Sequence, residues 1–147
     1  MSTPCQIGII RANGRVKSIY CHNNGGSSHI RKILTEAYAS TEAVEALLKL
    51  GDISVLGRKL APGPGTHSVE KPQPDVTVAY VRDDERPKAE NKPYTDRNVT
   101  AFTKMYADRH CYLYDVRSGT WLHAGPYSDF NPLETSDNGK GAVQNGT

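Results

Sequence analysis

The sequence predicts an α+β fold: an antiparallel sheet built from two hairpins and a middle strand, covered by two or three short helices. Three observations support this prediction. Residues 6–22 and 110–124 each contain two apolar stretches around a turn, and residues 29–50 carry apolar side chains at helical spacing. The expected order is ββ-αα-β-α-ββ. Because strands and helices do not alternate regularly, a doubly wound nucleotide-binding fold is not expected.

The first hairpin is expected over residues 6–22, around the dipeptide Asn13-Gly14. Asn-Gly tolerates positive φ at both central positions of a two-residue type I′ turn, whose twist matches that of paired strands. With a turn of this length, Ile7 lies opposite Tyr20.

Two short helices are expected in tandem within residues 29–50. Ser27 or Ser28 is a good N-cap for the first helix, and Ser40 for the second. Gly51 suits the position just after the second helix. The apolar residues that recur at three- and four-residue spacing are Ile30, Ile33, Leu34, Ala37, Tyr38, Val44, Leu47 and Leu48.

The middle of the chain is expected to be a long loop followed by one strand. Four prolines within residues 57–75 exclude regular structure there, and residues 76–82 are rich in β-branched side chains. A charged segment over residues 83–93 then leads to a short helix. Thr95 or Asp96 is expected to cap this helix, which ends near residue 107.

The second hairpin is expected over residues 110–124, with its turn at residues 117–119. Residues 131–147 are polar and rich in glycine, so we expect a flexible C-terminal tail. Residues 1–130 are expected to form a single domain, because a chain of this length can bury one core of its own.

The charge of the chain is nearly balanced, with 18 Lys and Arg against 16 Asp and Glu. Residues 1–60 hold eight of the basic residues and four of the acidic ones, so this part carries the positive excess. Nucleic-acid-binding domains usually show a larger and more clustered excess. We therefore expect no DNA or RNA polymer as a partner, whereas an anionic partner of modest size fits.

Localisation follows from hydropathy and cysteine content. No apolar run reaches the roughly 18 residues of a membrane span, and residues 1–5 lack the charged start of a secretion signal. Three cysteines cannot all pair within the chain, and a reducing compartment suits them. We expect a cytoplasmic protein without a membrane partner.

Histidines and cysteines are common metal ligands and can form a nucleophile–base pair. The candidates for either role are Cys21-His22, His29 and His110-Cys111. Adjacent residues on a strand point to opposite faces, so neither Cys-His pair is suited to hold one metal ion. We therefore expect no metal and no cofactor, with the cysteines packed as small apolar side chains. A small metal-dependent or cysteine-dependent hydrolase stays open as an alternative function.

The acidic residues Asp83, Asp84 and Glu85 are a second possible cation or acid–base site. Basic residues surround them on both sides, which is typical of a solvated loop that neutralises its own charge. We expect such a loop here.

The segment from His22 to Lys32 is the best candidate site, because a strand leads through a Gly-rich loop into a helix. Backbone N–H groups and the helix dipole at such a start favour an anion. The segment has no Gly-x4-Gly-Lys-[Ser/Thr] spacing and is not a P-loop. Arg82 is added on the expectation that strand 76–82 lies beside strand 15–22. The predicted ligand-binding residues are His22, Asn24, Gly25, Gly26, Ser27, Ser28, Arg31, Lys32 and Arg82.

Several of these residues also carry a resemblance to a known family. The segments concerned are Tyr20-Cys21-His22 with the following Gly-containing loop, Leu50-Gly51-Asp52, and Tyr112-Leu113-Tyr114-Asp115 followed by Trp121. This pattern resembles a family of small, uncharacterised phage and prophage proteins. At the loop, Asn23, Asn24 and Gly26 stand where that family has Trp, Asp and Tyr.

The resemblance implies a phage or prophage origin. Because the sequence shows no specific catalytic motif, we expect a small, non-enzymatic accessory protein in the host cytoplasm. By analogy with such proteins, it is expected to inhibit a host component, as in counter-defence. It would do so by sequestering a nucleotide-type signal or by occupying a host protein. The expected partner is a host protein or a phosphorylated small molecule, and the protein is a possible homo-oligomer. A phage structural or accessory protein without a ligand is a further alternative.

Overall fold

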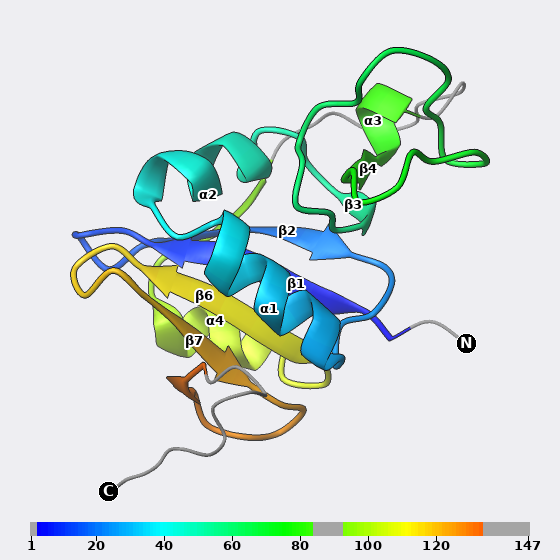
Figure 1. The fold of residues 1–147 in the computed structure, drawn as a ribbon. Helices are drawn as coiled ribbons and strands as arrows, with labels where there is room; N and C mark the ends of the chain where they lie inside the picture. Colours follow the sequence, from blue (N-terminus) through cyan, green and yellow to red (C-terminus); the bar gives the residue numbers. More distant parts are fainter. Residues whose placement is uncertain (1–2, 84–92, 134–147) are drawn as a thin grey trace, which may run out of the picture.

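The computed structural model describes residues 3–83 and 93–133 and contains a mixed sheet with helices on both faces (Figure 1). The α+β class is therefore confirmed. The strands are β1 (Cys5–Ile10), β2 (Val16–Cys21), β3 (Ile53–Val55), β4 (Val78–Ala79), β5 (Tyr94–Asp96), β6 (His110–Asp115), β7 (Thr120–Ala124) and β8 (Asn131–Pro132). The helices are α1 (Ser28–Ala37), α2 (Thr41–Leu48), α3 (Tyr80–Asp83) and α4 (Val99–Met105).

The sheet has the strand order β4-β3-β2-β1-β6-β7-β8, and β5 pairs with β2 outside this path. The two expected hairpins, β1–β2 and β6–β7, are antiparallel. They are joined by a parallel pairing of β1 with β6, and β2 and β3 are also parallel. The antiparallel arrangement thus holds within the hairpins but not between them. The reason is that α4 carries the chain from the Val16 end of β2 to the Cys5 end of β1, where β6 begins.

The turn of the first hairpin differs from the predicted one. Gly14 N–H donates to the Arg11 carbonyl at 2.8 Å, and Arg11 N–H donates to the Arg15 carbonyl at 2.9 Å. The loop therefore has three residues, with Gly14 in the left-handed region at φ 86°. This shift of one residue pairs Ile7 with Ile19 instead of Tyr20. It places the apolar Ile19 on the core face and turns Tyr20 to the opposite face.

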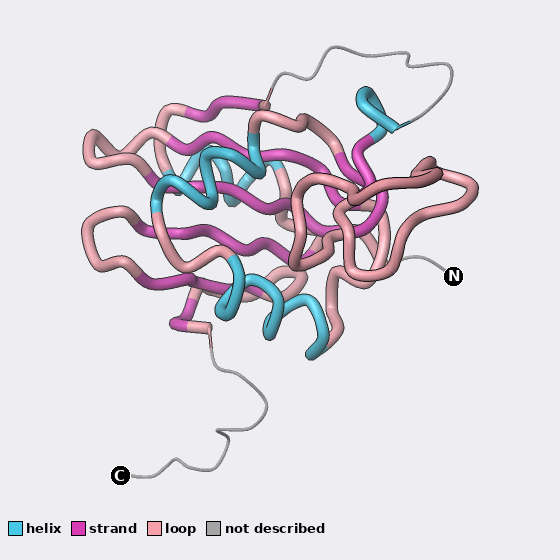
Figure 2. Tube along the Cα trace, turned by 45° about the horizontal axis from the view of Figure 1, so that its top comes forward, coloured by secondary structure: helices cyan, strands magenta, loops and turns pink. Residues whose placement is uncertain are grey.

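The core lies between one face of the sheet and helices α1 and α2 (Figures 1 and 2). Both helices begin at the expected caps: Ser27 Oγ accepts from the Ile30 amide, and Ser40 Oγ accepts from the Ala43 amide. Their buried residues Ile30, Ile33, Leu34, Val44, Leu47 and Leu48 match the predicted stripe. Helix α4 covers the opposite face and buries Phe102 there.

Two elements in the second half are shorter than predicted. Within 76–82 only β4 is strand, because the Asp83 carboxylate accepts from the Ala79 amide at 2.9 Å and the chain turns into α3. The helix expected from residue 95 begins after Asn98, whose side-chain oxygen accepts from the Ala101 amide at 2.8 Å. Thr95 belongs to β5 instead.

The expected flexible tail does not begin at residue 131. Residues 131–132 form β8, and the Leu133 amide donates to the Trp121 carbonyl at 2.8 Å. Residues 134–147, and residues 84–92 of the charged segment, lie outside the described residues. The single domain over residues 1–130 stays a prediction. Among the described residues, no helix has the length and hydrophobicity that a membrane crossing requires.

We predict that Gly8→Ala destabilises the protein. A Cβ at this position of β1 would lie 2.4 Å from the Lys17 carbonyl oxygen and 2.8 Å from Ser18 Cβ, so the strands would have to separate. Denaturant unfolding should show a loss of about 1–3 kcal/mol, the usual cost of overpacking. Gly63→Ala is the control, because its nearest neighbour would lie at 3.7 Å. Equal stability of the Gly8→Ala variant and the wild type would contradict the β1–β2 packing.

Candidate functional site

The predicted anion loop, residues 22–28, leaves β2 and enters α1 at one end of the sheet (Figure 1). Its path is fixed by internal hydrogen bonds. Asn24 is left-handed at φ 67°, and its carbonyl accepts from both the amide and the hydroxyl of Ser27. The Gly25 amide donates to the Thr3 carbonyl at 2.7 Å. Two of the amides that were expected to meet a ligand are thus engaged within the protein.

The two glycines of the loop are required by packing. A Cβ on Gly25 would lie 2.6 Å from the Thr3 carbonyl oxygen and 2.7 Å from that of Pro4. A Cβ on Gly26 would lie 2.8 Å from His110 Nε2. The loop approaches the start of β1 and His110 so closely that only glycine fits at these two positions. Their presence therefore does not require a bound ligand.

The remaining predicted loop residues have different surroundings. The His22 ring hydrogen-bonds to the Tyr20 hydroxyl at 2.8 Å, and its amide donates to the Ile53 carbonyl. Asn24 and Ser28 are exposed, and Lys32 is half-buried. Arg31 is the predicted residue whose side chain lies close to two histidines, His110 and His123.

Beneath the loop, four side chains from three elements form what we call the Arg31 cluster: Arg31 of α1, His110 and Tyr112 of β6, and His123 of β7. His110 Nδ1 and His123 Nε2 share a hydrogen bond of 3.0 Å, and their rings stack with centroids 5.3 Å apart. His123 also stacks on Tyr112 at 4.7 Å. The Tyr112 hydroxyl donates to the Gly25 carbonyl at 2.6 Å, which ties the cluster to the loop.

Strand alternation and register explain this arrangement. Every second residue of β6 faces α1, which selects His110 and Tyr112, and the β6–β7 register puts His123 directly across from Tyr112. His110 was a sequence candidate only as a metal ligand or base, and His123 was missed. The signal that would have found both is the pairing of the second hairpin.

The cluster is basic but holds little charge at neutral pH. Burial lowers the pKa of His110, and the nearby Arg31 guanidinium lowers it further. Burial, again helped by Arg31, lowers the pKa of His123 to about 4. Burial raises the pKa of Tyr112 to about 12, against the effect of Arg31. Both imidazoles are therefore neutral at pH 7, and Arg31 supplies the charge.

Arg31 has an unsatisfied donor. Its Nε is buried and has no hydrogen-bond partner among the described residues. Within the same residues, no acidic side chain forms an ion pair with Arg31. A buried donor without a partner is costly, and a cation with no nearby carboxylate attracts an anion. The cluster therefore favours a nearby acceptor group that carries negative charge.

The strand register pairs Cys5 with both Cys21 and His110, so two thiols and an imidazole lie near one another in the described part of the chain. All three cysteines are free and buried. Burial raises the pKa of the Cys5 thiol well above its usual range and that of Cys111 to about 12, so neither forms a ready thiolate. The described residues contain no group of three or more His, Cys, Asp or Glu that would bind a metal ion.

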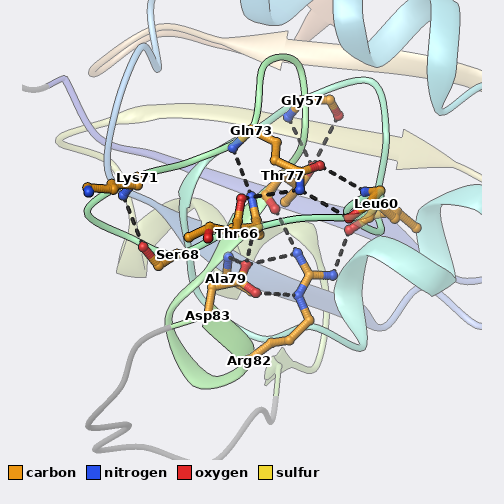
Figure 3. A network of polar contacts seen from close by, with 12 residues as sticks. Gly57, Leu60, Thr66, Ser68, Lys71, Gln73, Thr77, Ala79, Arg82 and Asp83 are labelled. Carbon is orange, nitrogen blue, oxygen red and sulfur yellow. Dashed lines mark hydrogen bonds and ion pairs between the residues drawn. The ribbon is translucent and has the colours of Figure 1, made fainter.

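The expected position of Arg82 is wrong, because β3 lies between β4 and β2. Its guanidinium instead donates hydrogen bonds within the long loop (Figure 3). It donates to Asp83 Oδ1 at 2.8 Å, to the Leu60 carbonyl at 2.6 Å and to the Thr77 carbonyl at 2.7 Å. Arg82 therefore holds the loop of residues 57–83 and does not complete the anion loop.

Asp83 is buried, which corrects the expectation of a solvated acidic loop; Asp84 and Glu85 lie outside the described residues. Burial alone would raise its pKa, but hydrogen bonds from Arg82 and the Ala79 amide outweigh this and lower it. His67 Nε2 lies 3.2 Å from its carboxylate.

The His67–Asp83 pair does not form a catalytic base. The Gln73 amide donates to His67 Nδ1 at 3.0 Å, so the ring proton of the neutral imidazole is on Nε2, facing Asp83. Both ring nitrogens of His67 are therefore occupied. This pair secures the long loop.

Comparison of the chain with protein-family models, with curated proteins and with solved structures gives no match. The candidate site is therefore defined by its geometry. The resemblance to phage proteins stays a prediction.

We predict that stability falls as the pH drops from 6.5 toward 4, because unfolded His123 takes up a proton that the folded residue, with a pKa of about 4, does not. Thermal unfolding between these pH values should show a smaller slope of Tm with pH for His123→Gln. His29→Gln, at an exposed position of α1, should keep the wild-type slope. An unchanged slope in His123→Gln would contradict the burial of a neutral ring.

We further predict that Asp83→Asn loosens the loop of residues 57–83, since it removes the negative charge that pairs with Arg82 and accepts the hydrogen bond from His67. The variant should lose about 1–3 kcal/mol, the usual cost of leaving buried donors poorly satisfied. Trypsin should cut after Lys59, an exposed residue of that loop, faster than in the wild type. Glu70→Gln, an exposed change in the same loop, should leave the rate unaltered. Equal cleavage rates in all three proteins would show that the network does not restrain the loop.

Proposed function

We propose that this is a non-enzymatic binding protein that holds a phosphorylated small molecule of the nucleotide type at the Arg31 cluster. The observation that carries the proposal is the buried Arg31 Nε, which lacks a partner among the described residues and lies beside two histidines. Phosphate oxygens are strong acceptors, and a guanidinium is the side chain best matched to them.

Each member of the cluster has a role in this proposal. Arg31 contributes the fixed charge and its unpaired donor. His110 and His123 contribute imidazoles that gain a proton more easily once an anion lies beside them. The start of α1 adds the positive end of a ten-residue helix. Tyr112 positions the loop through the Gly25 carbonyl.

Binding without turnover fits the chemistry of the site better than catalysis does. Nucleophilic catalysis requires a side chain activated by a base, and the thiols of Cys5 and Cys111 are held protonated. A site of this kind sequesters its ligand. The resemblance to phage proteins supplies the setting: an accessory protein that removes a nucleotide-type signal from a host pathway in the host cytoplasm.

We predict that Arg31→Gln weakens nucleotide binding at least about tenfold, about 1.4 kcal/mol. Calorimetric titration with AMP and 3′,5′-cyclic AMP measures the effect. Lys32→Gln is the matched control, because Lys32 is the next residue of the same helix and belongs to no part of the cluster. The Tm of Arg31→Gln should change little, because loss of the interaction with Tyr112 is offset by removal of the unsatisfied buried Nε donor.

Two outcomes would count against this function. Failure of the wild type to bind either nucleotide would exclude this ligand class and favour occupation of a host protein. Equal weakening by Arg31→Gln and Lys32→Gln would indicate a diffuse electrostatic effect in place of a site.

A further inference from the structure

A cavity of about 200 Å³ lies on the face of the sheet opposite α1. Its walls come from the end of α4, the start of β6 and the segment after β7. The residues that matter for its chemistry are Tyr106, Arg109, Cys111, Tyr127, Asp129 and Phe130. The cavity thus combines aromatic rings with one cation and one carboxylate.

The Arg109 guanidinium is held in place by aromatic and polar contacts. It lies 5.7 Å from the centroid of the Tyr20 ring and 5.3 Å from that of the Tyr106 ring. One of its nitrogens donates to Gln6 Oε1 at 3.1 Å, and Gln6 Nε2 donates to Ser18 Oγ at 3.1 Å. The cation therefore has a fixed orientation before any ligand arrives.

Buried polar groups hold the Arg109 side chain in this position. Gln6 and Ser18 are fully buried in the middle of the sheet, where apolar residues would pack without any need for hydrogen bonds. Among the described residues, the other polar contact of the Arg109 side chain is a 3.6 Å ion pair between its Nε and the exposed Asp108. Within the described residues, three of the five N–H donors of the guanidinium have no hydrogen-bond partner.

The aromatic residues give the cavity its apolar part. The Phe102 ring packs against those of Tyr106 and Phe130, at centroid distances of 4.8 and 6.4 Å, which holds the two cavity-lining rings in place. Tyr127 is 82% exposed although its backbone is fixed by a hydrogen bond from its amide to the Ala107 carbonyl. It has a left-handed φ of 56°, a costly conformation for tyrosine that is often found at ligand sites.

We infer that this cavity is a second binding site, for a small planar aromatic molecule that carries one oxyanion, either a carboxylate or a phosphate. The ring of the ligand packs among the aromatic side chains, and its oxyanion accepts from the Arg109 fork. The volume is below the roughly 300–1,000 Å³ of sites for drug-sized ligands, so a single ring system fits. This inference does not depend on the Arg31 cluster, which lies on the other face.

Titration with benzoate, phenyl phosphate and the neutral benzyl alcohol, followed by ligand-observed NMR, tests the site. One or both anionic compounds should bind, and the better of the two identifies the oxyanion. Benzyl alcohol should bind at least about tenfold more weakly, because it lacks the charge that Arg109 recognises. Equal binding of benzyl alcohol, or no binding of either anion, would overturn the inference.

Three variants separate the cavity from other sites. Arg109→Lys keeps the positive charge but lacks the paired N–H donors of a guanidinium. It should weaken binding of the anionic compounds about tenfold. Tyr127→Ala changes an exposed side chain and tests the aromatic wall without endangering the fold. Arg117→Met, at an exposed turn, is the control and should bind as the wild type does. Binding that survives both cavity variants, or that Arg31→Gln abolishes, would assign the compounds to another place.

Discussion

The parallel pairing of β1 with β6 holds together the rest of the structure. It aligns two hairpins that begin at Cys5 and His110, and it sets which residues become neighbours across the middle of the sheet. On one face it brings His110 under the loop that precedes α1. On the other face it brings Arg109 to Gln6. Both candidate sites therefore depend on contacts that form only when the first and last thirds of the described chain meet.

Local features of the fold could be predicted from the sequence because their causes are local. Ser27 and Ser40 cap their helices, since a hydroxyl before an apolar helical stripe satisfies the first free amides. The turn at Asn13-Gly14 was located correctly but was one residue too short, because glycine also suits the left-handed position of a three-residue loop. Such a difference is decided by which side chain the core accepts, here Ile19.

The features that the sequence did not reveal depend on distant partners. His123 becomes part of a site only through its stack on Tyr112 and its bond to His110, and neither follows from spacing along the chain. Asp83 was expected to be solvated because basic residues surround it in the sequence. In the structure its carboxylate is buried, where it hydrogen-bonds to His67 and accepts from the Ala79 amide. Arg82 was predicted as a ligand residue from the position of its strand, and the insertion of β3 removed that possibility.

The short strands at the two ends of the sheet have a consequence for the behaviour of many copies of the protein. The main path of the sheet ends in β4 and β8, which have two residues each, and β5, which pairs with β2 outside this path, has three. Pro132 of β8 has no N–H to offer, and after β4 the chain turns at once into α3. Long, flat edge strands are the usual templates on which chains stack edge to edge into fibrils. Among the described residues, none of these edge strands is long enough to be such a template, which makes these edges poor sites for the growth of a continuous sheet between copies of the chain.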